Sequence, residues 1–217
     1  MRIEKLLITA FLLTSSTALP SVVTYTSSAA FEAALTGNPT LVENYGTFTA
    51  GDLILPGSTF DGITYTNFNL GASSTQDGIV SNQFNSFSGL SLGANQSNGA
   101  AQFFFDGNSF DIGFASAVAI GVFFNVNANS GTYGIVTPVG NASTGSASYD
   151  TSTFVFAGLI STTPFTSAQI SSDSGGAGTA SYNVAEMILA SAPEPAAIAL
   201  TALGTGFFLL LRRRTAA

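Results

Sequence analysis

Short apolar runs, separated by glycine, serine and asparagine, recur along most of the chain. Alternation of apolar and polar positions at 63–68 and 110–114 predicts half-buried strands. The largely apolar stretches 118–126 and 133–139 predict strands of the buried type. About ten short strands at this spacing, without a solenoid or propeller repeat, predict an all-β fold, a jelly-roll-like β-sandwich.

One segment in the first part of the chain is predicted to be a helix rather than a strand. Residues 27–35 read as one short helix, with Ser27 at its start and Gly37 where a glycine C-cap is favourable. Residues 71–100 are dominated by glycine, serine, asparagine and glutamine, which predicts long loops with brief strands. Further strands are expected at 22–26, 41–45, 52–55, 154–156, 167–171 and 182–189.

The N-terminus has the three parts of a secretory signal. Arg2 and Lys5 precede an apolar run at 6–13, and small residues follow up to Ala18. We therefore expect a signal peptide at 1–18, cleaved after Ala18, and a body at 19–192. An uncleaved N-terminal anchor is the alternative, although the apolar run is short for a bilayer span.

The C-terminal segment, residues 193–217, has a different composition from the body. Pro193, Glu194 and Pro195 precede sixteen apolar residues at 196–211, which are followed by Arg212, Arg213 and Arg214. As a helix the apolar segment is about 24 Å long, which spans a membrane with help from snorkelling arginines. The positive-inside rule keeps the arginines cytoplasmic and the body outside.

Pro-Glu-Pro, a short apolar helix and a terminal arginine cluster resemble the PEP-CTERM sorting signal of exported proteins of Gram-negative bacteria. The resemblance implies recognition by an exosortase, a membrane-embedded cysteine transpeptidase, and transfer to the envelope or extracellular matrix. A plain membrane anchor at 196–211 is the alternative. Both interpretations place the body outside the inner membrane.

Charge is distributed unevenly along the chain. All five basic residues lie in the two terminal segments, and the chain has no histidine. The body has ten carboxylates and no basic residue; these are Glu32, Glu43, Asp52, Asp61, Asp77, Asp106, Asp111, Asp150, Asp173 and Glu186. A surface of this sign repels phosphate backbones, so we exclude nucleic acid as a partner.

The composition also excludes most catalytic machinery. Without histidine or cysteine there is no Ser-His-Asp triad, no thiolate nucleophile and no His/Cys zinc site. A carboxylate pair, as in glycoside hydrolysis, is the remaining option. The chain lacks the tryptophan platforms common in glycosidase clefts. We therefore expect no enzymatic activity and name no catalytic residue.

Calcium is the one cofactor that the carboxylates suggest, because it takes oxygen ligands in glycine-rich loops. Asp77, Asp106 and Asp173 stand next to glycine or asparagine in such segments. None of them has EF-hand spacing. Ordinary turns, in which Asp and Gly satisfy the turn geometry, explain the same residues.

Aromatic residues are the candidates for sugar contact. Residues 103–105 and 123–124 are phenylalanine runs in which neighbouring rings point to opposite faces of a strand, although burial in the core is the favoured interpretation. Tyr65, Tyr133, Tyr149 and Tyr182 are further candidates for stacking on a carbohydrate.

The later half of the body also resembles β-sandwich domains of PEP-CTERM proteins. Those domains often carry Asp-Asn or Asp-Asp in the last strand, where this chain has Ala185-Glu186-Met187. This difference weakens the case for a metal site there.

The sequence thus predicts an exported, exosortase-sorted cell-surface or matrix protein, whose non-catalytic β-sandwich contacts extracellular polysaccharide or simply forms part of the envelope. A calcium-stabilised carbohydrate-binding module is the alternative, and a carboxylate-pair glycosidase is a more remote one. Expected partners are the exosortase, the membrane through 196–211, and polysaccharide.

Overall fold

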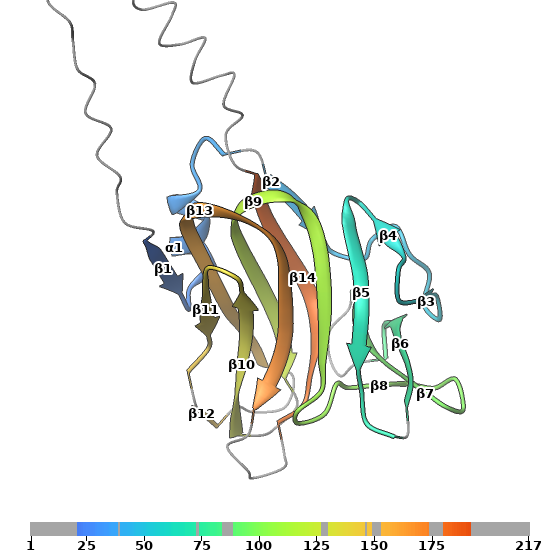
Figure 1. The fold of residues 1–217 in the computed structure, drawn as a ribbon. Coiled ribbons are helices and arrows are strands. Elements are labelled where there is room, and N and C mark those ends of the chain that lie inside the picture. The colour runs from blue at the N-terminus through green and yellow to red at the C-terminus, as the bar shows by residue number, and fades with distance from the viewer. Residues whose placement is uncertain are drawn as a thin grey trace, which may run out of the picture.

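Antiparallel β-structure dominates the body, as the sequence predicts. The computed structural model describes residues 21–38, 40–72, 74–83, 89–126, 130–145, 147–148, 153–173 and 180–191. These residues form fourteen strands and one short helix, so the all-β class is confirmed (Figure 1). The elements are β1 (Val22–Tyr25), α1 (Ser28–Ala34), β2 (Thr40–Glu43), β3 (Leu53–Ile54), β4 (Thr59–Phe60), β5 (Ile63–Asn69), β6 (Ser74–Ser81), β7 (Ser91–Gln96), β8 (Ala101–Gln102), β9 (Ser109–Val126), β10 (Ser130–Thr137), β11 (Gly140–Ser143), β12 (Ala147–Ser148), β13 (Thr153–Asp173) and β14 (Tyr182–Ser191).

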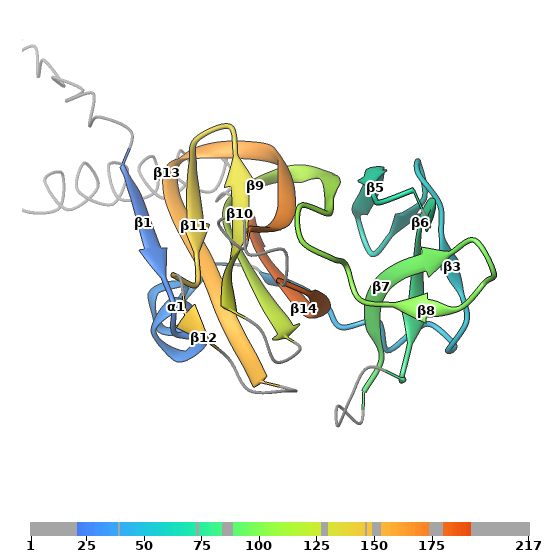
Figure 2. The ribbon, with the colours of Figure 1, turned by 90° about the horizontal axis from the view of Figure 1, so that it is seen from below.

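The main sheet has the strand order β11-β10-β13-β9-β14-β7-β6-β3. Strands β3 to β8 gather on one side of the long strands β9 and β13, and β1, β10 to β12 and α1 gather on the other (Figures 1 and 2). Strand β5 pairs with the first half of β9, and β1 pairs with the first half of β13.

Strands β9 and β13 are far longer than predicted, with 18 and 21 residues. The sequence predicts two separate strands in each, at 110–114 and 118–126 and at 154–156 and 167–171. The structure joins them, and the pairing of β9 with β13 shifts register between Ile160 and Ser167. Pro164 lies inside this irregular stretch, where a missing ladder hydrogen bond is tolerated. The proline therefore marks a bend rather than a break.

The bend lets the sheet fold over on itself around the core. Residues 109–114 of β9 pair with β5, whereas residues 117–126 pair with β14. The ring of Phe124, in the second half of β9, lies 5.8 Å from the ring of Tyr133 on β10, which pairs with the last part of β13. Side chains of both layers therefore share one core, which includes Phe104, Phe110, Phe124, Tyr133 and Tyr182.

Residues 71–100 contain more strand than predicted, and the expectation of long loops is wrong for β6 and β7. Their buried positions include Asp77, Ser91 and Asn95, so the apolar pattern that marks a strand is missing. The side chains satisfy one another instead: Asn95 Nδ2 donates to Asp77 Oδ1 at 3.1 Å, and Gln102 Nε2 donates to Ser74 Oγ at 3.0 Å.

Helix α1 confirms the predicted helix at 27–35. Ser27 is its N-cap, where its side-chain oxygen accepts from the amide of Ala30, and Gly37 has a φ of +87°. The helix docks on the outer face of the sheet through Phe31, which is fully buried against Phe156.

None of the helices among the described residues is long and apolar enough to cross a membrane. The predicted signal peptide at 1–18, with Ala18, lies outside the described residues. So does the segment 193–217, with Pro193, Glu194, Pro195, the predicted span 196–211 and Arg212, Arg213 and Arg214.

Candidate functional site

The candidate site lies on the outer face of the layer formed by β9, β13 and β14. Side chains alternate between the two faces of a strand. Val122 and Phe124 of β9 are fully buried in the core, so Phe123 between them points outward. The register places Phe156 of β13 and Glu186 of β14 beside Phe123, on either side of it.

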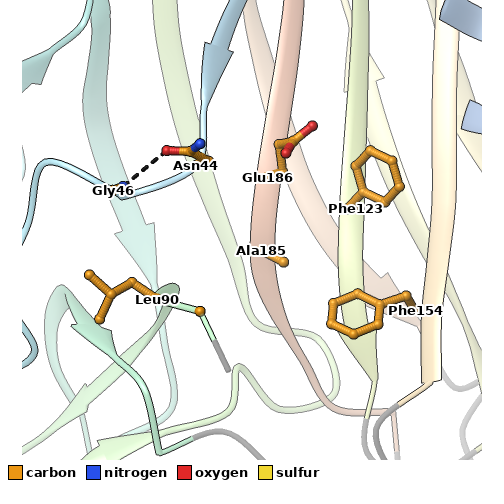
Figure 3. Close-up of a pocket in the computed structure, with 8 residues that line it drawn as sticks. Asn44, Gly46, Leu90, Phe123, Phe154, Ala185 and Glu186 are labelled. Carbon is orange, nitrogen blue, oxygen red and sulfur yellow. Dashed lines mark hydrogen bonds between the residues drawn. The ribbon is translucent and has the colours of Figure 1, made fainter. Parts of the chain in front are cut away.

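Phe123 and Glu186 line a pocket of about 520 Å³, which is within the size range of small-molecule sites. Figure 3 shows Phe123 and Phe154 one above the other along the sheet, with Glu186 beside Phe123 and Leu90 across the pocket. The lining is mostly apolar, with a few polar groups at the rim; it consists of Asn44, Gly46, Gly89, Leu90, Phe123, Phe154, Ala185 and Glu186.

Contacts with neighbouring rings fix the position of the aromatic wall of the pocket. The ring of Phe123 lies edge-to-face against Phe156 at 5.0 Å, and Phe156 lies 5.3 Å from Phe31 of the docked helix. This row of rings fixes Phe123 in place before any ligand arrives. Phe154, two residues before Phe156 on β13, is 45% exposed.

Two polar side chains lie on the same side of this wall (Figure 3). Asn44 Oδ1 accepts a hydrogen bond from the amide of Gly46 at 3.0 Å, which orients the side-chain amide at the rim (Figure 3). The half-buried carboxylate of Glu186 lies between Asn44 and Phe123 (Figure 3). Burial, and next the negative charge of Glu32, raise the pKa of Glu186 above its ordinary value.

Glu186 also lines a second pocket, of about 390 Å³, together with Glu32 of α1. The chain has no Lys or Arg between Lys5 and Arg212, so the body contains no basic side chain that could neutralise this pair. The site is therefore an aromatic pocket with negative charge along one side.

A buried amide lies on the same sheet face. Asn183 pairs with Asn125 in register, and Asn125 shares the outward orientation of Phe123 two residues earlier. The Asn183 side chain is fully buried, and neither its Oδ1 nor its Nδ2 has a hydrogen-bond partner among the residues that the structure describes. Polar groups of this kind are unfavourable in a purely structural face.

The structure buries most of the aromatic candidates. Tyr65, Tyr133 and Tyr182 are fully buried, so the prediction that they stack on a carbohydrate at the surface is wrong. Tyr149 lies outside the described residues. In the phenylalanine runs, Phe104 and Phe124 belong to the core, whereas Phe105 is 49% exposed and Phe123 lines the pocket.

The three metal candidates lie in different surroundings. Asp77 belongs to strand β6 rather than a loop, and it accepts hydrogen bonds from Thr75 and Asn95. Asp106 lies in a turn before β9, and Asp173 ends β13. Within the described part of the chain, no three Asp or Glu side chains gather closely enough to hold a metal ion. Calcium binding stays a prediction.

Sequence reasoning missed the pocket although its signal was present. Glu186 is the one charged residue in the otherwise apolar stretch 184–190. A register irregularity between Val184 and Glu186 inserts Ala185 as an extra residue, and this places Glu186 on the same face as Phe123. Such a bulge cannot be read from alternation alone.

The chain was compared with protein-family models, with curated proteins and with solved structures, and none of the three comparisons found a match.

A second carboxylate, Glu43, gives a prediction about stability. It is 2% exposed; its Oε1 accepts from the amide of Tyr45 at 2.6 Å, and its Oε2 has no hydrogen-bond partner within the described part of the chain. Burial raises the pKa of Glu43, the Tyr45 hydrogen bond lowers it by less, and Asp61 raises it further. A raised pKa in the folded state means that stability is lost as the pH rises through that pKa.

We therefore expect Glu43→Gln to raise the melting temperature at pH 7 and to reduce the stability difference between pH 4 and pH 7. Circular dichroism melts at the two pH values measure both effects. Asp52→Asn removes the same charge from an exposed position and serves as the control. A Glu43→Gln variant that melts below the parent protein at pH 7 would contradict the argument.

Proposed function

We propose that this protein is exported, sorted by an exosortase through residues 193–217, and displayed at the cell surface or in the extracellular matrix of a Gram-negative bacterium. There its β-body contacts extracellular polysaccharide without catalysis. The support from the sequence is the PEP-CTERM-like tail, together with basic residues that occur only in the terminal segments.

The body itself is best interpreted as a jelly-roll-like β-sandwich. The two layers that β9 and β13 build by folding over, with a shared aromatic core, agree with this interpretation. In this proposal residues 196–211 form the membrane helix that precedes sorting.

The observation that carries the polysaccharide contact is the position of the aromatic pocket relative to the chain ends. Ser21 bonds to Thr162, and Ser191 pairs with Ala117, so both ends of the body lie where the long strands bend. Glu186 is five residues before Ser191 along β14, which is about 16 Å at the rise of a strand. A body tethered beyond Ser191 therefore holds the pocket away from its tether.

Mass spectrometry of the mature protein from its host tests the export and sorting. We expect an N-terminus just after Ala18 and a C-terminus near Pro193 to Pro195, because the signal peptidase and the exosortase each remove one end. Intact, full-length chain found only in the cytosol would refute the proposal.

A second candidate function, glycoside hydrolysis, has one specific observation in its favour. Glu32 and Glu186 line the same pocket, and the raised pKa of Glu186 suits a general acid. Polysaccharide turnover by the mature protein, abolished in Glu186→Gln and in Glu32→Gln, would establish it. Absence of turnover together with retained polysaccharide binding would favour the non-catalytic function.

A further inference from the structure

We propose that the aromatic pocket binds an amine-bearing sugar, the protonated hexosamine unit of a polysaccharide. Its amino group lies against Glu186, and its ring lies over Phe123 and Phe154. This inference rests on the proposed polysaccharide contact and specifies which sugar the pocket prefers.

The first step is the charge of the pocket. Glu186 is half-buried and has Glu32 as its charged neighbour, and no basic side chain of the body can pair with either. A carboxylate that loses part of its hydration without a counter-charge is unfavourable. A cation from outside the chain supplies the missing partner, and an anionic sugar such as a uronic acid is repelled.

The second step is the aromatic wall. A cation over the face of an aromatic ring is attracted by the ring quadrupole, which contributes about 0.5–1 kcal/mol at exposed sites. Phe123 stands directly beside Glu186 in register and is held by Phe156. An amino group at this point meets a carboxylate and a ring at once.

The third step distinguishes a sugar from a basic peptide. Peptides that bind to sheets usually do so by adding a strand to an open edge. Strand β9 has β13 on one side and β14 on the other, so this part of the pocket floor has no open edge. A sugar needs no such edge: its apolar face covers Phe154 and Leu90, and its hydroxyl groups reach the rim amide of Asn44.

Three hexasaccharides with the same β-1,4 linkage provide the test, namely those of glucosamine, N-acetylglucosamine and glucose. Binding to the mature protein is measured by isothermal titration at pH 6, where the glucosamine amines are largely protonated. We expect the glucosamine hexamer to bind about tenfold more tightly than the other two, a difference of about 1.4 kcal/mol. Equal affinity for all three would overturn the inference.

Variants locate the binding. Glu186→Gln should remove the preference for glucosamine, whereas Asp52→Asn, which removes one exposed charge away from the pocket, should keep it. Phe154→Ala should weaken binding of the glucosamine hexamer, whereas Phe105→Ala, a phenylalanine of matched exposure outside the pocket, should not. Equal loss in Glu186→Gln and Asp52→Asn would show non-specific charge attraction and refute the site. Melting temperatures confirm that each variant is folded.

Two further arms separate this inference from the proposed function. The protein could bind the host's own matrix polysaccharide, lose this binding in Phe154→Ala, and still show no preference for amine-bearing sugars. This result would keep the proposed polysaccharide contact and reject the hexosamine as its ligand. In the second arm, oligolysine competes with the glucosamine hexamer. If oligolysine displaces the hexamer and binds more tightly than it does, the ligand is a basic polypeptide and the inference is rejected.

Discussion

Tyr182→Ala is expected to lower the free energy of unfolding by about 3–5 kcal/mol, the range for loss of a large aromatic side chain from a core. The ring is fully buried and has three aromatic neighbours: Phe104 at 5.1 Å, Phe124 at 5.5 Å and Tyr133 at 5.9 Å. These neighbours belong to different parts of the folded sheet. The cavity that the substitution leaves therefore lies where both layers meet.

The hydroxyl group of Tyr182 adds a smaller contribution. It donates to the carbonyl oxygens of Asn108 and Ile170, both at 3.3 Å. Tyr182→Phe keeps the ring and loses these contacts, so we expect a loss of about 1 kcal/mol. Urea unfolding followed by circular dichroism compares the two variants. A Tyr182→Ala variant within 1 kcal/mol of Tyr182→Phe would show that the core closes around the missing ring.

Gly121→Val is expected to destabilise the protein by about 2–3 kcal/mol, because overpacking a rigid contact forces side chains and backbone to move. Gly121 and Gly158 are opposite each other on β9 and β13 and form a flat floor under Phe156 and Phe31. A Cβ at position 121 would lie 2.6 Å from Phe156 Cζ and 2.9 Å from Phe31 Cε1. Neither ring can move away freely, since each packs against the other.

Gly113→Ala is the matched control, because Gly113 lies on the same strand and its nearest neighbour to a new Cβ is 3.8 Å away. This variant should be close to neutral. A double variant, Gly121→Val with Phe156→Ala, should be less destabilised than the sum of the two single variants, since the ring that causes the clash is gone. Simple additivity in chemical denaturation would contradict the proposed contact.

The class of fold and its single helix could be predicted from local signals. Ser27 and Gly37 frame α1 by capping chemistry that acts over a few residues. Alternation identified the first half of β9 as a strand, and a largely apolar stretch identified the second half. Their union could not be predicted, because it depends on how β13 bends at Pro164 to follow β9 across both layers.

The pocket could be predicted only in part. The alternation of Phe123 and Phe124 shows that one ring faces outward, but the sequence does not show which layer covers which face. The residues that share the pocket with Phe123 come from distant positions, such as Asn44, Leu90 and Glu186. Strand pairing brings them together, and a bulge at Ala185 sets the face of Glu186.

Strands β6 and β7 could not be predicted because they are rich in polar residues. Their buried positions are filled by hydrogen-bonding side chains such as Asp77 and Asn95, which read as loop residues in a linear pattern. Each is stable in the interior because its partner is on the neighbouring strand. The linear sequence pattern does not show which polar side chains will form hydrogen bonds with each other across neighbouring strands.

The direction of β14 has a mechanical consequence. In the proposed arrangement, polysaccharide pulls on the pocket, which includes Phe123 of β9 and Phe154 of β13, and the tether pulls on β14 beyond Ser191. The load therefore passes from β9 to β14, parallel to the strands. The ladders of β14 with β9 on one side and with β2 on the other then resist in shear, with many hydrogen bonds loaded together. A body loaded in this way withstands the drag of flowing water better than one whose last strand is peeled off bond by bond.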